Sequence, residues 1–206
     1  MAIYFISDLH IGHNREFLYL PRGFESIEEH DRAISENWNR TVSEDDEVYL
    51  LGDVMLNDME YGLEIVRRLK GHIHIIRGNH DTDQKVEHYA ELANVVEVVA
   101  AAYLKAGRVS MYLSHFPTLV SYKKLDKKGL PLINLYGHTH QKTNFFDDGV
   151  NGVHPFMYHV GVDSHNLTPV LLEDVIEEVR AKKNECAEMQ QQDVHLPNER
   201  WQDNSH

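Results

Sequence analysis

Short polar clusters follow the stretches of this 206-residue chain that have the composition of β-strands. The clusters are Asp8-Leu9-His10, Gly52-Asp53, Gly78-Asn79-His80-Asp81, Ser114-His115, Gly137-His138 and Thr139-His140. Each one offers side chains that bind metals or transfer protons where a buried strand opens into a loop. In open α/β folds, ligands bind at the carboxyl ends of the strands. The pattern therefore predicts an α/β fold in which separate strand ends build one polynuclear site.

The hydrophobic spacing changes character along the chain. The first half alternates strands with helices, whereas the second half is richer in strands. Ser26 and Glu29 match a capping box at the start of the first long helix. Strands are expected at residues 3–7, 47–51, 72–77, 95–99, 101–105, 108–114, 133–136, 156–160 and 170–171, and helices at residues 27–40, 59–70, 83–92 and 173–189. This order favours two packed sheets flanked by helices.

The chain shows no internal repeat and no linker that would divide it, so we expect one domain over residues 1–189. The segment 190–206 is polar and weakly patterned, and we expect it to be disordered. No apolar run approaches the length of a membrane span, and the first residues lack a basic leader. A membrane protein and a secreted protein are therefore not expected.

Composition restricts the partners and the metal chemistry. The net charge is −13, which argues against a partner made of duplex nucleic acid, because affinity for a duplex comes mainly from Lys and Arg. A phosphate ester substrate remains compatible with this charge, since bound cations invert the potential of an acidic pocket. The single cysteine, Cys186, fits a reducing compartment, and we expect a cytoplasmic protein. It also excludes a zinc site built from thiolates, so nitrogen and oxygen atoms must hold any metal.

The clusters together resemble the calcineurin-like metallophosphoesterase superfamily. Its pattern is D-x-H, then G-D, then G-N-H-D or G-N-H-E, then a single H, then G-H-x-H, and each part is present in order over residues 8–140. Residues 8–14 and the segment from Tyr158 to Pro169, with Gly161-Val162-Asp163, are similar to a small bacterial or phage branch of the family.

The resemblance implies a four-layer αββα sandwich, with two mixed sheets between helices, that carries two divalent metal ions. Asp8, His10, Asp53 and His140 would hold one ion, and Asp53, Asn79, His115 and His138 would hold the other. Asp53 would bridge them, because the two oxygens of a carboxylate can serve cations about 3.5–4 Å apart. Mn is the first choice, and Fe, Zn, Ni and Co also suit imidazole and carboxylate ligands. His115 is the least secure ligand, because a lone histidine is more often structural.

The same resemblance implies hydrolysis of a phosphate ester. Two cations that share a water would turn it into a hydroxide nucleophile, which attacks phosphorus in line with the leaving oxygen. His80 is not among the expected ligands, so we assign it to the leaving group, as a proton donor or as a group that stabilises the alkoxide. Asp81 would orient His80 or be a partner of Asp8 or His10.

Other polar residues near these clusters have two interpretations. His13, Asn14 and Arg15 form either a solvated loop or a substrate rim, in which Arg15 or Arg22 would clamp a phosphate oxygen. Asp163-Ser164-His165 repeats the D-x-H spelling, but we expect no direct metal contact from it and leave open a supporting role for His165.

The expected function is a metal-dependent phosphoesterase that acts on a small phosphomonoester or phosphodiester. A nuclease or cyclic-nucleotide phosphodiesterase on the same site is the alternative, and a binding scaffold without catalysis is a rival from another class. The sequence gives no sign of the basic groove that a nuclease would need. The basic patch of Lys123, Lys124, Lys127 and Lys128 beside Tyr122 is expected to face solvent.

Overall fold

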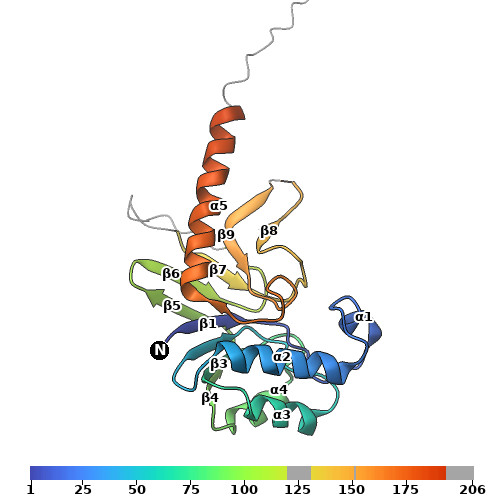
Figure 1. Ribbon diagram of the computed structural model, residues 1–206. Coiled ribbons are helices and arrows are strands. Elements are labelled where there is room, and N and C mark those ends of the chain that lie inside the picture. Colours follow the sequence, from blue (N-terminus) through green and yellow to red (C-terminus); the bar gives the residue numbers. More distant parts are fainter. Residues whose placement is uncertain (120–130, 151, 194–206) are drawn as a thin grey trace, which may run out of the picture.

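The computed structural model describes residues 1–119, 131–150 and 152–193, and side chains as far as residue 189 (Figure 1). Strands and helices alternate as far as β4, and strands predominate after it, as predicted. The strands are β1 (Ile3–Ile6), β2 (Glu47–Leu50), β3 (His72–Ile76), β4 (Val95–Val99), β5 (Ala102–Ala106), β6 (Val109–Leu113), β7 (Ile133–Tyr136), β8 (Phe145–Asp147), β9 (Val153–His159) and β10 (Val170–Leu171). The helices are α1 (Glu16–Tyr19), α2 (Ile27–Thr41), α3 (Met59–Arg67), α4 (Asp83–Ala90) and α5 (Leu172–Asp193).

The first sheet has the order β10-β1-β2-β3-β4. β1 to β4 run parallel, and β10 is antiparallel to β1. Successive side chains of a strand point to opposite faces. Ile6 accordingly packs with the buried core under the helices, whereas its neighbour Phe5 packs with the second sheet. Both faces of this sheet are therefore covered, as expected of a mainly parallel sheet.

Helices α2, α3 and α4 cover one face of the first sheet (Figure 1). Trp38 of α2 and Tyr89 of α4 are fully buried in that layer. The indole Nε1 of Trp38 donates to the carbonyl of Lys70 at 2.9 Å, so burial leaves this polar atom satisfied. Truncation of a buried side chain of this size typically costs about 3–5 kcal/mol.

The second sheet has the order β5-β6-β7-β9-β8 and packs on the free face of the first sheet. β6, β7 and β9 run parallel, while β5 and β8 are antiparallel edge strands. α5 packs against this sheet, where Asn144 Nδ2 donates to Glu178 at 2.7 Å and Lys182 lies over the Phe145 ring. The layers are thus helices, sheet, sheet and helix, which confirms the predicted αββα class (Figure 1).

Some local expectations need correction. α1 and β8 were not predicted, and both are short. The hydroxyl of Ser26 accepts from the backbone N–H of Glu29 as expected of an N-cap, but the Glu29 carboxylate accepts from the N–H of Glu25 rather than from that of Ser26. α5 continues past residue 189 to Asp193, so the first residues of the predicted tail are helical.

The rest of that tail, 194–206, and the basic patch of Lys123, Lys124, Lys127 and Lys128 lie outside the described residues. Within the part of the chain that the structure describes, no helix combines the length and the apolar character that crossing a bilayer requires.

Candidate metal centre

The carboxyl ends of parallel strands from both sheets meet at one place. Beyond β1, Ser7 leaves the first sheet and pairs with Gly161, which follows β9 of the second sheet. The N–H of Ser7 donates to Val160 O at 3.0 Å, and the N–H of Val162 donates to Ser7 O at 3.1 Å. The loops after β1, β2, β3, β6, β7 and β9 are thereby brought together, and they carry all the predicted ligands.

Most of these ligands have an unusual backbone. The φ angles of Asp8, His10, Asp53, His138 and His140 lie between +50° and +68°. This left-handed region is sparsely populated by residues other than glycine, although Asp and His enter it more readily than most. Such strain concentrates at functional sites, where the surrounding structure over-determines it.

Glycines next to the ligands allow the loops to approach closely. A Cβ at Gly137 would collide with the Ser7 hydroxyl and with Asp8 Oδ2, and a Cβ at Gly78 would collide with Asp53 Oδ1. Gly137 follows β7 and Gly78 follows β3. The absence of a side chain lets the loop after β7 approach Asp8 and the loop after β3 approach Asp53. Glycine, which has no Cβ, permits such a close backbone approach.

Asp8, His10 and His140 form the first cluster, with one potential ligand atom from each within 4.8 Å of the others. The Nε2 atoms of His10 and His140 are 3.1 Å apart. Both Asp8 oxygens accept from the backbone N–H of His138, at 3.1 and 2.9 Å, and Oδ2 also accepts from the Ser7 hydroxyl at 2.5 Å. Burial disfavours the charged form of both groups, so it raises the pKa of Asp8 and lowers the pKa of His10. A positive charge nearby would favour the ionised form of Asp8.

Asp53, His115 and His138 form the second cluster, in which one potential ligand atom from each residue also lies within 4.8 Å of the others. Asn79 joins it, because its Oδ1 is 2.8 Å from His115 Nε2 and 2.9 Å from His138 Nδ1. His115 Nδ1 donates to the carbonyl of Leu51 at 2.8 Å, which directs Nε2 toward the other ligands. His115, the least secure of the predicted ligands, thus has a buried ring fixed by the backbone.

Asp53 lies between the two clusters. Its Oδ2 is 3.6 Å from His10 Nε2 on one side and 3.6 Å from His115 Nε2 on the other. The side chain is almost fully buried, and Oδ1 accepts from the backbone N–H of His80 at 2.9 Å. One carboxylate therefore faces ligand nitrogens of both groups.

The tautomers fixed by neighbouring acceptors fit a site for cations. His140 Nδ1 lies 2.8 Å from Asp163 Oδ2, so Nδ1 carries the hydrogen and Nε2 presents a lone pair. The Leu51 carbonyl imposes the same tautomer on His115. Imidazole lone pairs and carboxylate oxygens converge in a partly buried site, where a divalent cation would offset their mutual repulsion. The donor set of nitrogen and oxygen atoms suits divalent transition metals.

A buried ion pair behind the first cluster was not predicted from the sequence. The Arg22 guanidinium donates to both oxygens of Asp163, at 3.1 and 2.8 Å, and its side chain is 2% exposed. It also donates to the carbonyls of Asp8 at 3.0 Å and Leu9 at 3.4 Å. Arg22 thus ties the loop after β1 to Asp163, which in turn orients His140.

Electrostatics support this arrangement. Burial by itself would raise the pKa of Asp163, but hydrogen bonds from His140 and Arg22 outweigh burial and lower it. Burial would lower the pKa of His140, and the hydrogen bond to Asp163 with the charge of Asp8 raises it instead. A carboxylate that accepts from the outer nitrogen of a metal-binding histidine fixes the ring and makes it a stronger ligand.

Asp81 has a different role from the one expected. Its Oδ2 accepts from the backbone N–H of Asp53 at 2.9 Å and of Gly78 at 2.8 Å, and its Oδ1 accepts from the N–H of Val54 at 3.2 Å and from the hydroxyl of Tyr89 at 3.0 Å. It is therefore bound to backbone amides rather than to His80, Asp8 or His10. This corrects the expectation that Asp81 orients a catalytic side chain: it holds the loops after β2 and β3 together.

His80 and His13 lie beside the first cluster. The His80 side chain is 42% exposed, and its Nε2 is 3.9 Å from Asp53 Oδ2. The rings of His80 and His13 are each centred 5.4 Å from that of His10, and 6.5 Å from one another. Burial lowers the pKa of His13, which favours its neutral form. Of the three predicted rim residues, His13 is the one whose side chain reaches the site.

The remaining expectations for the rim change. Asn14 and Arg15 are exposed and make backbone hydrogen bonds near the start of α1. Arg22 is not a phosphate clamp, since its guanidinium is buried and bound to protein acceptors. The supporting role left open for His165 belongs to Asp163, because His165 Nε2 instead contacts the carbonyl of His159 at 2.8 Å.

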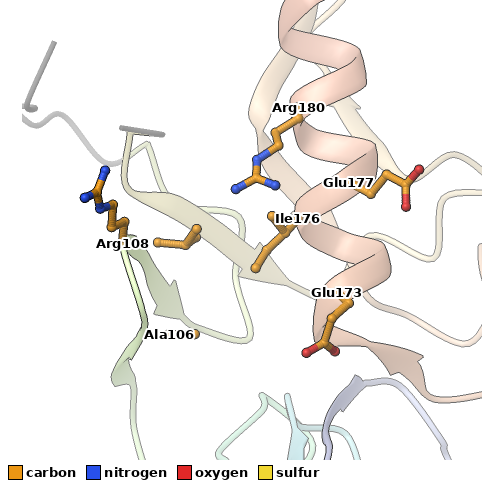
Figure 2. A pocket seen from close by; sticks show the side chains of 7 residues that line it. Ala106, Arg108, Glu173, Ile176, Glu177 and Arg180 are labelled. Carbon is orange, nitrogen blue, oxygen red and sulfur yellow. The ribbon is translucent and has the colours of Figure 1, made fainter. Parts of the chain in front are cut away.

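A separate cavity of about 560 Å³ lies between the β5–β6 hairpin and α5 (Figure 2). Figure 2 shows Arg180 and Ile176 of α5 pointing toward the hairpin that carries Arg108. Its lining contains no member of the two clusters. The cavity contributes nothing to the metal centre.

Comparisons with known proteins agree with this architecture. A family model described as the calcineurin-like phosphoesterase superfamily domain matches residues 1–161. The gene 66 protein of Mycobacterium phage D29 is 29% identical over an alignment of 209 positions. The alignment covers 90% of this chain and 98% of that protein. An uncharacterised protein of Methanocaldococcus jannaschii is 42% identical over 81 residues, and the match spans 38% of this chain and only 46% of that protein.

A crystal structure of a protein of unknown function from Aquifex aeolicus has the same fold. It aligns with a TM-score of 0.61 at 19% identity, over 85% of this chain and 98% of the other. The family match covers most of the chain, including all of the loops that carry the two clusters. The chain therefore belongs to the calcineurin-like phosphoesterase superfamily.

Proposed function

We propose that this protein hydrolyses a small phosphomonoester or phosphodiester with the help of two divalent metal ions. The observation that carries the proposal is the position of Asp53 Oδ2, 3.6 Å from a ring nitrogen of each cluster. Asp8, His10, Asp53 and His140 would hold one ion, and Asp53, Asn79, His115 and His138 the other. Membership of the phosphoesterase superfamily supports the reaction class.

The bound ions would supply the Lewis acidity that activates water and neutralises the phosphoryl oxygens. Mn is our first choice of metal, and Fe, Zn, Ni and Co also suit imidazole nitrogens and amide or carboxylate oxygens. The chain itself contributes fixed ligand positions: Asp163 orients His140, and the Leu51 carbonyl orients His115. Such preset ligands require little rearrangement when substrate binds.

His80 would assist departure of the leaving group. Its backbone N–H is fixed on Asp53 Oδ1 at 2.9 Å, while its ring stays half exposed at the mouth of the site. A ring in that position can reach a substrate oxygen without being a metal ligand. It would donate a proton to the leaving oxygen or stabilise the alkoxide, a contribution that is typically about 10²–10⁴-fold in rate.

The acidic surface favours a small substrate. A net charge of −13 repels a polyanion, so a nuclease that binds long nucleic acid is the weaker alternative. Cyclic nucleotides and dinucleotides are small enough to avoid this repulsion. A cytoplasmic location is part of the proposal and rests on the single cysteine, Cys186.

The test is reconstitution of metal-free protein with Mn, followed by analysis of bound metal and of hydrolysis of p-nitrophenyl phosphate and bis-p-nitrophenyl phosphate. We expect two ions per chain and Mn-dependent release of p-nitrophenol from at least one of the esters. Less than one ion per chain, with neither ester hydrolysed, would favour the non-catalytic scaffold instead.

A further inference from the structure

Two phenylalanine side chains project into solvent beside the metal centre. Phe17 of α1 is 72% exposed, and Phe116, which follows His115, is 49% exposed. Single exposed apolar residues are common on protein surfaces and need no explanation. These two differ because the Phe116 ring contacts two histidines of the second cluster, and the Phe17 ring contacts His13, which lies beside the first cluster.

The contacts place one phenylalanine next to each cluster. The Phe116 ring is centred 4.7 Å from that of His138 and 5.0 Å from that of His115, at interplanar angles of 64° and 77°. Both of these histidines belong to the second cluster. Phe116 therefore packs edge to face on ligands of the second cluster while about half of its surface stays open to solvent.

Phe17 occupies the corresponding place on the side of the first cluster. Its ring is centred 5.5 Å from that of His13 at an interplanar angle of 86°, and His13 in turn lies against His10. His80, the residue assigned to the leaving group, is on this same side. A planar group attached to the phosphate on either side would thus meet a phenyl ring.

We propose that the substrate is a phosphodiester that carries a nucleobase or a similar planar ring, and that the phenylalanine on the side of that ring, Phe17 or Phe116, binds it by stacking. This inference rests on the proposed phosphoesterase function and narrows its substrate class. Stacking between a base and an aromatic side chain tolerates different bases, because each base has a π face. The net charge favours a mononucleotide diester or a dinucleotide over a long strand.

The experiment uses the full chain loaded with Mn and two diesters that share one leaving group. Thymidine 5′-(p-nitrophenyl phosphate) carries a nucleoside on the retained side, and methyl p-nitrophenyl phosphate carries only a methyl group there. We expect the wild-type protein to show a kcat/KM for the nucleoside ester at least about 10-fold higher, as one stacked base would provide. Because the leaving group is the same, its own contacts cancel in this ratio.

Phe116→Ala, Phe17→Ala and the double variant test the two rings. At least one single variant should lower the preference for the nucleoside ester by roughly 10-fold, and Phe→Trp at the same position should restore it. Tyr103→Ala is the matched control, because Tyr103 is an exposed aromatic residue of β5 whose hydroxyl bonds to Ser110, and it should leave the preference unchanged. Equal kcat/KM values for the two esters in the wild-type protein, or an unchanged preference in the double variant, would overturn the inference.

The design separates this inference from the function on which it rests. If Mn-loaded protein hydrolyses neither of these diesters nor p-nitrophenyl phosphate, the proposed function fails. If it hydrolyses p-nitrophenyl phosphate but neither diester, the phosphodiester inference fails while the proposed function stands. If it hydrolyses both diesters without preference, only the stacking proposal fails. A third comparison measures cleavage of a dithymidine phosphate against a thymidine 20-mer, per phosphodiester bond. Faster cleavage of the dinucleotide is expected, and faster cleavage of the 20-mer would reject the small-substrate class.

Discussion

The two ligand clusters lie side by side but are held in place by different means. In the first cluster, His140 is oriented by the side chain of Asp163, which is itself paired with the buried Arg22. In the second cluster, His115 is oriented by a backbone carbonyl, that of Leu51. Asp81 adds to this second arrangement by accepting from the backbone amides of Asp53 and Gly78.

This difference determines which substitutions can separate the clusters. A side chain that orients a ligand can be replaced without a change in the main chain, so the first cluster can be weakened on its own. A backbone carbonyl cannot be replaced in this way, so the second cluster changes mainly through its own ligands. Asp53 faces both clusters, and its loss should abolish the distinction between them.

The largest effect is expected for Asp53→Asn. The amide keeps an oxygen that can accept from the N–H of His80, but it removes the charge that faces both clusters. Bound Mn should fall for both sites together, and hydrolysis of bis-p-nitrophenyl phosphate should be lost. Elemental analysis after gel filtration measures the metal, with Glu60→Gln in the first turn of α3 as a control. Retention of one full equivalent would show that the clusters do not share this carboxylate.

His80→Ala should separate metal binding from turnover. The protein should keep both ions, because His80 is not a member of either cluster, while kcat falls by about 10²–10⁴-fold. The loss should be larger for an alkyl leaving group than for p-nitrophenolate, which needs little protonation. Steady-state rates on methyl p-nitrophenyl phosphate and on a dialkyl phosphate measure this difference. An equal loss on both substrates would argue against proton donation.

Asp163→Asn should weaken only the first cluster. Removal of a carboxylate that supports a metal-binding histidine typically costs about 10–100-fold in metal affinity. Titration of metal-free protein with Mn in a calorimeter should show one site weakened by this factor and the other unchanged. Arg22→Lys should also lower the Mn affinity of the first site, because lysine cannot reproduce the bidentate contact with Asp163. The loss should be smaller than for Asp163→Asn, because Asp163 itself remains in place to accept from His140. Equal weakening of both sites would mean that the two clusters are not held independently.

The smallest effect is expected for a substitution at Asp46. This residue precedes β2, at the opposite end of the strand from Asp53. Its carboxylate accepts from the backbone amides of Ala2 at 2.7 Å and Ser43 at 3.0 Å, at the start of β1 and β2. These hydrogen bonds, led by that of Ala2, lower the pKa of Asp46. Asp46→Asn should therefore reduce the free energy of unfolding by about 1 kcal/mol at pH 7 and leave Mn affinity unchanged.

The sign of the pH dependence follows from that lowered pKa. A carboxyl whose pKa is lower in the folded state stabilises the fold above its unfolded value of about 3.9, and this stabilisation is lost as the pH falls through the folded pKa. The difference between wild-type protein and Asp46→Asn in urea unfolding should shrink over that acidic range. A difference that grows as the pH falls would contradict the assignment. Unchanged metal binding in this variant would show that a modest loss of stability does not by itself abolish metal binding at the clusters.

The sequence predicted the elements that position the site. β1, β2, β3, β6 and β7 fall where apolar runs predicted strands, because such runs are local and their ends are marked by polar ligands and glycine. The fold class followed from the order of elements and from the family resemblance. The side chains of Asp8, Asp53 and His138 do converge with the other expected ligands, although their roles as ligands stay predictions.

What the sequence missed consists of contacts between distant segments. Arg22 and Asp163 are 141 positions apart, so no local sequence pattern pairs them. Asp163 was set aside as a repeat of the D-x-H spelling, although its carboxylate orients His140. Asp81 was expected to orient His80 or to be a partner of Asp8 or His10, but the fold turns its oxygens toward backbone amides.

The sequence by itself determined the kinds of ligand atoms present and the strand ends that deliver them, because strand periodicity and ligand chemistry are properties of a few adjacent residues. The tertiary structure decided which carboxylate supports which histidine, and which aromatic rings stand beside them. Those choices depend on the approach of two sheets at Ser7 and Gly161 and on the buried charge of Arg22. Buried polar groups must find partners wherever the fold places them, and only the folded chain specifies those places.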